Sequence, residues 1–156
     1  MEADTLGGAL EREHRQIDGG IEAYLAGLDG TADPGPLRAA LDGLRRHIYL
    51  EEEFLFPPLK AAGLMGPIFV MLREHGQLWT SMDKVEQLLA DGADPEARRG
   101  ACTTLLALLD AHNSKEEPII YSQADAILSE EAGSELTEFL AGGTTPEGWV
   151  CSAATR

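Results

Sequence analysis

A chain of 156 residues is long enough to form one domain with its own apolar core. Its formal net charge of −15 argues against nucleic acids and anionic membranes as partners, because an acidic surface repels phosphate groups. Leu and Ala dominate the apolar residues and only 6% of the chain is aromatic, a balance that favours helices over strands.

The compartment is predicted from what the sequence does not show. The N-terminus carries no pattern of a secretory signal, and no apolar run approaches the ~18 residues of a membrane span. Cys102 and Cys151 fit neither a disulfide framework nor a zinc knuckle. We therefore expect a cytoplasmic protein in a reducing setting.

The first half of the chain predicts two amphipathic helices. The apolar stripe of the first helix contains Leu10, His14, Ile17, Ile21, Tyr24 and Leu28. The stripe of the second contains Leu37, Leu41, Leu44, Ile48, Glu51 and Leu55, with His47 beside it. Residues 31–36, with two prolines and a glycine, break the chain between them. Pro57 and Pro58 are expected to kink or end the second helix near Phe56.

The second half predicts two more helices. The stripe of the third contains Ile68, Leu72, His75, Met82, Val85 and Leu89. The stripe of the fourth contains Leu105, Leu108, Leu109, His112 and Glu116, and continues through Ile119 and Ile120 beyond a kink at Pro118. Residues 91–95 separate the two helices, with Asp94 as an N-cap and Pro95 at the first helical position.

Four amphipathic helices joined by short loops favour an all-α fold, an antiparallel up-and-down four-helix bundle. A short fifth helix is expected around residues 134–140. We predict that residues 1–141 form a single bundle domain and that residues 142–156 form an irregular C-terminal tail.

The histidines indicate the chemistry. Each predicted helix carries one histidine on or next to its apolar stripe, so four imidazoles face one interior. Glu51 follows His47, and Glu116 follows His112, at a spacing of four, which puts both members of each pair on one helix face. A bare carboxylate in the core suffers a desolvation cost of several kcal/mol, and neither stripe contains a lysine or arginine. A bound metal removes this cost for both glutamates.

The sequence also contains an internal repeat. Residues 12–17 (REHRQI) match residues 73–78 (REHGQL), and the His-x3-Glu-Glu motif at residues 47–52 returns at residues 112–117. Two helix pairs, each with two histidines and one glutamate, predict a pseudo-twofold site. Two metal ions fit such a site, each held by two histidines and bridged by both glutamates.

The donor set narrows the choice of metal. Imidazole and carboxylate suit iron, manganese or zinc. Zinc has no redox chemistry and usually takes four ligands in closed structural sites. Two histidines and shared carboxylates leave open positions on each ion, which suit O2, NO or peroxide. We therefore predict two iron ions, bridged by carboxylates and an oxo or hydroxo group, and rank manganese and zinc lower.

These motifs resemble those of the hemerythrin-like family, also called the HHE cation-binding domain, over roughly residues 5–128. The matching pieces are Glu-His at 13–14, HIYLEEEFLFPPL at 47–59, REHGQL at 73–78 and HNSKEEPIIY at 112–121. The resemblance implies that the iron ligands are His14, His47, Glu51, His75, His112 and Glu116.

Two departures from the oxygen-carrying hemerythrins affect the expected function. Those proteins have a further histidine where this chain has Met71, and an aspartate five residues after the last histidine, where Glu116 here follows His112 at four. The four-histidine, two-glutamate set is more similar to bacterial relatives linked to nitric oxide, peroxide and iron–sulfur repair. The resemblance therefore argues against a simple reversible O2 carrier.

Further residues near the ligands in the sequence are candidates for supporting roles. Tyr49 and Tyr121 are expected either to pack or to donate a hydrogen bond at the open positions. Glu52, Glu53 and Glu117 are expected to be solvated or to support the ligands from outside, and Glu52 is the best spare ligand if the metals lie off-centre. Met71 is expected to line the pocket. Cys151 in the tail is interpreted as inert or as a redox-active thiol.

The sequence leaves three functions open. The first is binding of O2, NO or H2O2 for sensing, scavenging or detoxification. The first alternative is iron storage, or iron donation for iron–sulfur cluster repair. The second alternative is an enzyme of the di-iron catalase or NO-peroxidase type. The expected partner is a small gaseous or peroxide ligand, and any signalling would require a second protein, which the sequence does not identify.

Overall fold

The computed structural model describes residues 5–28 and 32–154. Thr31, the first residue of the predicted break after the first helix, lies outside these ranges, as do the first four residues of the predicted domain and the last two of the predicted tail. The elements within the described ranges are all helical. None of these helices is long and apolar enough to cross a membrane.

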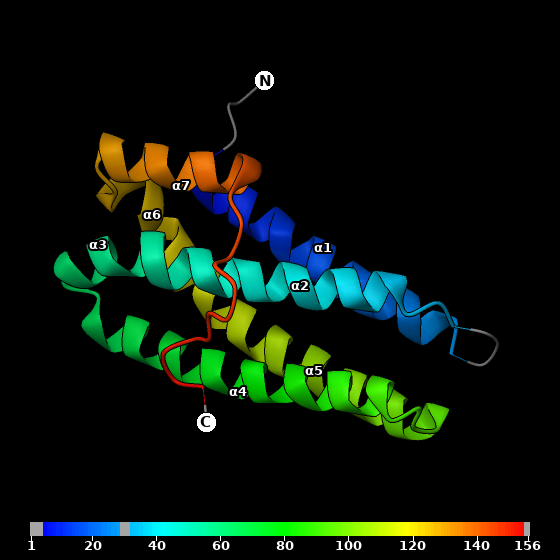
Figure 1. Ribbon diagram of the computed structural model, residues 1–156. Helices are drawn as coiled ribbons and strands as arrows, with labels where there is room; N and C mark the ends of the chain where they lie inside the picture. The colour runs from blue at the N-terminus through cyan, green and yellow to red at the C-terminus, as the bar shows by residue number, and fades with distance from the viewer. Residues whose placement is uncertain (1–4, 29–31, 155–156) are drawn as a thin grey trace.

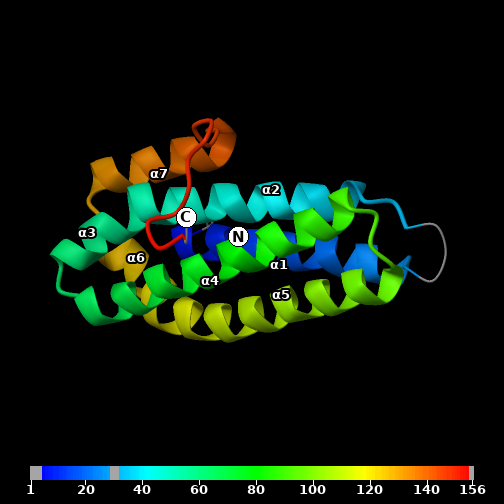
Figure 2. The same cartoon turned by 60° about the horizontal axis from the view of Figure 1, so that its bottom comes forward.

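Four long helices form the predicted antiparallel bundle, which confirms the fold class (Figure 1). Helix α1 (Leu6–Ala26) packs against α2 (Gly35–Leu50), and α4 (Met65–Ala90) packs against α5 (Pro95–Glu116). As predicted, Asp94 caps α5 by accepting a hydrogen bond from the N–H of Ala97, and Pro95 occupies the first helical position. Figure 2 shows the four helices running alongside one another from a second direction.

Neither proline motif ends its helix. After α2 the chain makes a π-helical turn, η1 (Glu51–Leu55), and continues as α3 (Phe56–Ala61). After α5 it makes a second π-helical turn, η2 (Glu117–Tyr121), and continues as α6 (Ser122–Ile127). A π turn takes up one extra residue, which shifts the buried face. The prediction that the stripe continues is confirmed for Ile120, which is buried, and wrong for Ile119, whose side chain is 46% exposed. Tyr121 is buried in its place.

The fifth helix is longer than predicted. Helix α7 (Glu130–Gly142) begins four residues before the predicted range, because the Ser129 side chain caps it by accepting a hydrogen bond from the N–H of Ala132. Its C-terminal end is fixed to the bundle by Arg46 of α2, which donates to the carbonyls of Phe139, Leu140 and Gly143.

Gly142, the first residue of the predicted tail, is the last residue of α7, and the described residues that follow, 143–154, are irregular but pack on the bundle. After α7 the tail crosses α2 and reaches α4 (Figure 1). The Trp149 ring lies 5.0 Å from that of Tyr49 and 5.6 Å from that of Trp79, between ring centroids, and Cys151 is buried. Gly76 permits this contact: a Cβ there would lie 2.6 Å from the carbonyl oxygen of Ala153.

The apolar core consists of two clusters with a polar layer between them. On α1, Leu10 belongs to one cluster and Ile17 to the other, and His14 lies between. On α4, Met71 and Leu78 flank His75 in the same way. The bundle therefore places one buried polar layer between two apolar clusters, and that layer holds the candidate site.

Candidate metal centre

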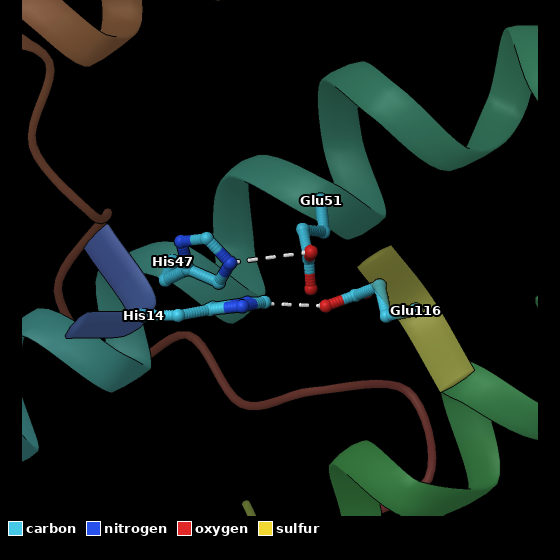
Figure 3. A group of neighbouring side chains, drawn as sticks. All are labelled: His14, His47, Glu51 and Glu116. Atoms are coloured by element: carbon cyan, nitrogen blue, oxygen red, sulfur yellow. Dashed lines mark ion pairs between the residues drawn. The ribbon is translucent and has the colours of Figure 1, made fainter. Parts of the chain in front are cut away.

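The structure brings all six predicted ligands together in the bundle interior. They form two overlapping groups, in each of which the ligand atoms lie within 4.8 Å of one another. The first group is His14, His47, Glu51 and Glu116 (Figure 3), and the second is Glu51, His75, His112 and Glu116. Both glutamates belong to both groups, as the predicted bridging roles require.

Glu51 lies between the two groups. Its Oε2 is 3.2 Å from Nε2 of His47, and its Oε1 is 2.9 Å from Nε2 of His75. The side chain has no solvent exposure. One carboxylate thus presents one oxygen to each group, which is the arrangement of a carboxylate that bridges two cations.

Glu116 is the residue that most needs a cation. Its side chain has no solvent exposure, and neither carboxylate oxygen has a hydrogen-bond partner among the described residues. Oε1 lies 3.2 Å from Nε2 of His14 and 3.4 Å from Nε2 of His112, one imidazole from each group. A buried carboxylate without hydrogen bonds is strongly unfavourable. A metal ion in either group would stabilise it.

A ring of outer carboxylates orients the histidines. Nδ1 of each histidine lies 2.7–2.8 Å from a glutamate oxygen. The pairs are His14 with Glu117, His47 with Glu13, His75 with Glu52, and His112 with Glu74. Because Nδ1 contacts an outer carboxylate, Nε2 of each imidazole points into the site as the candidate ligand atom. Carboxylate–histidine pairs of this kind accompany histidine metal ligands in proteins generally.

The repeat extends to these pairs. Glu13 and Glu74, which precede the first histidine of each half, bind the second histidine of the same half. Glu52 and Glu117, which follow the two inner glutamates, bind the first histidine of the opposite half. The sequence analysis expected Glu52 and Glu117 either in solvent or beside the ligands, but it missed Glu13 and Glu74. The signal for those two was present in the repeated Glu-His pairs.

The carboxylates control the protonation of the imidazoles. Burial alone lowers the pKa of His47, but the charge of Glu51 and hydrogen bonds to Glu13 and Glu51 raise it to about 10. Burial likewise lowers the pKa of His75, and hydrogen bonds to Glu51 and Glu52 raise it to about 9. For Glu51, burial raises the pKa, but the two histidines hold it well below its ordinary value. A metal ion would take the place of the imidazole protons.

Tyr121 reaches the centre of the first group. Its Oη donates a hydrogen bond to Oε2 of Glu51 at 2.5 Å and lies 2.9 Å and 2.8 Å from Nε2 of His14 and His47. Burial raises the pKa of this phenol well above its ordinary value, and the nearby Glu116 and Glu51 charges add to that effect. Of the two predicted candidate tyrosines, this one contacts the ligands.

The other residues predicted to support the site differ in where they lie and in what they contact. Of the two roles expected for Tyr49, the structure shows packing, in an aromatic cluster with Phe54, Phe139 and Trp149, and not the hydrogen bond at the open positions. Met71 is buried and lines a small apolar pocket. Glu52 binds His75 through the outer nitrogen and is not a spare ligand in this arrangement.

The site fits a pair of cations. Four imidazole nitrogens and two carboxylates converge, and each imidazole is oriented by an outer carboxylate. Neither oxygen of Glu116 has a hydrogen-bond partner among the described residues. Nitrogen and oxygen donors without thiolate suit iron, manganese or zinc. The geometry therefore supports a two-metal centre with Glu51 and Glu116 as bridges.

Comparisons with known proteins agree with this geometry. A model of the hemerythrin HHE cation binding domain family matches residues 5–124. The chain is 40% identical over 80 residues to "Iron-sulfur cluster repair protein YtfE" of Yersinia pestis (strain Pestoides F), and equally similar to the protein of that name from Yersinia pseudotuberculosis serotype O:1b (strain IP 31758). The match covers 49% of this chain and 35% of each relative, so it spans about a third of their length. No solved structure matches the chain significantly.

Proposed function

Because the chain belongs to the hemerythrin HHE cation-binding domain family, we propose that it holds two iron ions between its helices and donates iron for iron–sulfur cluster repair. Glu116 supports the metal part of the proposal, since its buried carboxylate lacks any hydrogen-bond partner among the described residues. The similarity to the cluster repair proteins supports the role.

The donor chemistry is consistent with iron transfer. The six predicted ligands offer only imidazole and carboxylate donors, whereas the scaffold of an iron–sulfur cluster offers thiolates. Soft thiolate ligands select iron–sulfur clusters, so a thiolate-rich apoprotein would draw iron from this site. Both cysteines of the chain are free and buried, which suits the reducing cytoplasm that we propose as its compartment.

Iron transfer can be measured directly. The iron-loaded chain is mixed without oxygen with an apo iron–sulfur protein and sulfide, in the presence of a chelator that captures free iron. The proposal predicts that cluster absorption appears and that the chain loses iron in proportion. A Glu116→Ala chain, treated identically, serves as the control and should support little cluster formation. Iron that stays on the wild-type chain while the apoprotein remains empty would contradict the proposal.

A second candidate is the binding of a small ligand such as O2, NO or H2O2. It is favoured by an apolar pocket of about 270 Å³ next to η2 and α4, lined by Gly66, Pro67, Val70, Met71, Lys115, Ile119 and Ile120. Met71 lies one turn before His75 on α4, so the pocket lies beside a helix that carries a predicted ligand, although none of the six ligands lines it. Iron supplies redox chemistry and open coordination positions for such ligands. Optical spectra of the reduced, iron-loaded chain before and after addition of NO test this candidate.

A further inference from the structure

The two halves of the metal centre differ at one pair of equivalent positions. Phe56 follows His47 by nine residues, and Tyr121 follows His112 by nine, so the repeat that relates the ligands also relates these two rings. Tyr121 is the last residue of η2 and Phe56 directly follows η1, and each lies five residues after a glutamate proposed as a bridge. One half therefore offers a phenol where the other offers a phenyl ring.

The π turn explains why these residues reach the site. In an unbroken α-helix, a residue five positions after Glu116 would face about 140° away from it. A π turn takes up an extra residue per turn, so it rotates Tyr121 back toward the face that carries Glu116. The equivalent π turn of the first half, η1, brings Phe56 to the face of Glu51.

The two rings meet different ligand groups. Phe56 stacks on His75, with ring centroids 5.4 Å apart and planes inclined by 19°, and it contributes no donor atom. Tyr121 places Oη between the ligand atoms of His14, His47 and Glu51, at 2.9, 2.8 and 2.5 Å. The His14–His47 group thus contains one more oxygen than the His75–His112 group.

These spacings are those of neighbouring ligands around one ion. Donor atoms about 2.1 Å from a six-coordinate ion and at right angles to one another lie about 3.0 Å apart. The Oη distances to the two imidazole nitrogens match that separation, as do the 3.2 Å separations between His14 and Glu116 and between His47 and Glu51. The 2.5 Å distance from Oη to Oε2 of Glu51 is shorter, as expected for a hydrogen bond from the phenol to a carboxylate. The phenol oxygen thus lies among the atoms that would surround an ion in this group.

We propose that Tyr121 is a metal ligand, bound through its phenolate oxygen to the ion held by His14 and His47. The phenolic proton, which now bonds to Glu51, leaves to solvent as the metal–oxygen bond forms. This ion then has five ligand side chains, whereas the ion at His75 and His112 has four. The second ion therefore keeps the more open coordination position. The inference rests on the proposed two-iron site.

Visible spectroscopy of the iron-loaded, oxidised chain tests the assignment, because a phenolate bound to iron(III) gives a charge-transfer band and enhanced tyrosinate modes in resonance Raman spectra. We expect both in the wild-type chain and neither in Tyr121→Phe. Tyr49→Phe is the matched control, since it removes a tyrosine hydroxyl that lies in the aromatic cluster and not at the site, and it should keep both signals.

Iron analysis of the same samples separates the two proposals. Two irons per chain with no tyrosinate signal in the wild type, or with the signal unchanged in Tyr121→Phe, would overturn the assignment of Tyr121 and leave the proposed iron site intact. A wild-type chain that takes up no iron would overturn the proposed function and this inference with it. The wild-type Raman spectrum needs no variant, so the assignment remains testable even if Tyr121→Phe fails to fold.

Discussion

Glu52 connects His75 to Ser152 in the C-terminal tail. One carboxylate oxygen of Glu52 lies 2.7 Å from Nδ1 of His75, and the other accepts a hydrogen bond from the N–H of Ser152 at 3.0 Å. A segment more than 70 residues away in sequence thus holds the carboxylate that orients a predicted metal ligand. The tail is part of the support of the metal centre.

Replacing Glu52 with glutamine should weaken metal binding at the His75–His112 position. The neutral amide keeps the shape of the side chain but no longer supplies the charge that supports the His75 imidazole. Loss of such an outer partner typically costs 10–100-fold in metal affinity, and we expect an effect of about that size. Competition with a metal chelator measures it.

Glu53→Gln is the matched control for this experiment. Glu53 is the next residue in the chain, carries the same charge and is exposed to solvent. It should leave the affinity unchanged. Equal losses in both variants would show that the overall negative charge matters, and not the contact with His75.

Gly76→Ala should displace the tail. The added Cβ would lie 2.6 Å from the carbonyl oxygen of Ala153, so either the tail or α4 must shift. We expect a loss of stability of about 1–3 kcal/mol, as for overpacked interiors, and a change in the fluorescence of Trp149, which packs on Trp79. Thermal unfolding followed by tryptophan fluorescence measures both.

Gly100→Ala provides the contrast. Gly100 lies in α5, and a Cβ there meets nothing within 4 Å. Because alanine favours helix over glycine, this variant should gain about 0.5–1 kcal/mol. If Gly76→Ala behaved in the same way, the tail would not be docked on α4 in solution.

The two thiols should react slowly at neutral pH. Burial raises the pKa of both Cys102 and Cys151 to about 11, and the neighbouring Glu52 charge adds to the effect at Cys151. Because thiolate is the reactive form, alkylation should be slow at pH 7–8, and fast for both cysteines once denaturant exposes them.

The raised pKa values of Cys102 and Cys151 also predict that the folded chain loses stability in alkali. A thiol whose folded pKa lies above its unfolded value of 9.0 keeps its proton in the folded chain while the unfolded chain loses it. The cysteines therefore favour unfolding as pH rises from about 9 to about 11.

Rapid labelling of Cys151 in the native chain at pH 7 would contradict its burial and would restore the interpretation of Cys151 as a redox-active thiol.

Much of the site could be predicted from the sequence because its signals are local. The spacing of four between His47 and Glu51 depends only on helical geometry, and the repeat locates the second pair without knowledge of the fold. The N-terminal end of α5 could also be predicted, because Asp94 and Pro95 act within a single helical turn.

The features that were missed depend on departures from regular helix or on distant contacts. The exposure of Ile119 follows from the π turn, which a period of 3.6 residues does not anticipate. The hydrogen bond from Ser152 to Glu52 joins residues with no local pattern in common. The outer carboxylates fall between these cases, since Glu13 and Glu74 are visible in the repeat but their partners lie on the next helix.

The central claim is that Glu51 and Glu116 bridge two metal ions in the bundle interior. Elemental analysis of the iron-loaded full chain, with Glu51→Ala and Glu116→Ala prepared in parallel, tests it most directly. Two irons per wild-type chain, the loss of most of that iron in each variant and a lower melting temperature in both are the expected results. A wild-type chain without transition metal, or variants that keep full occupancy, would contradict the account.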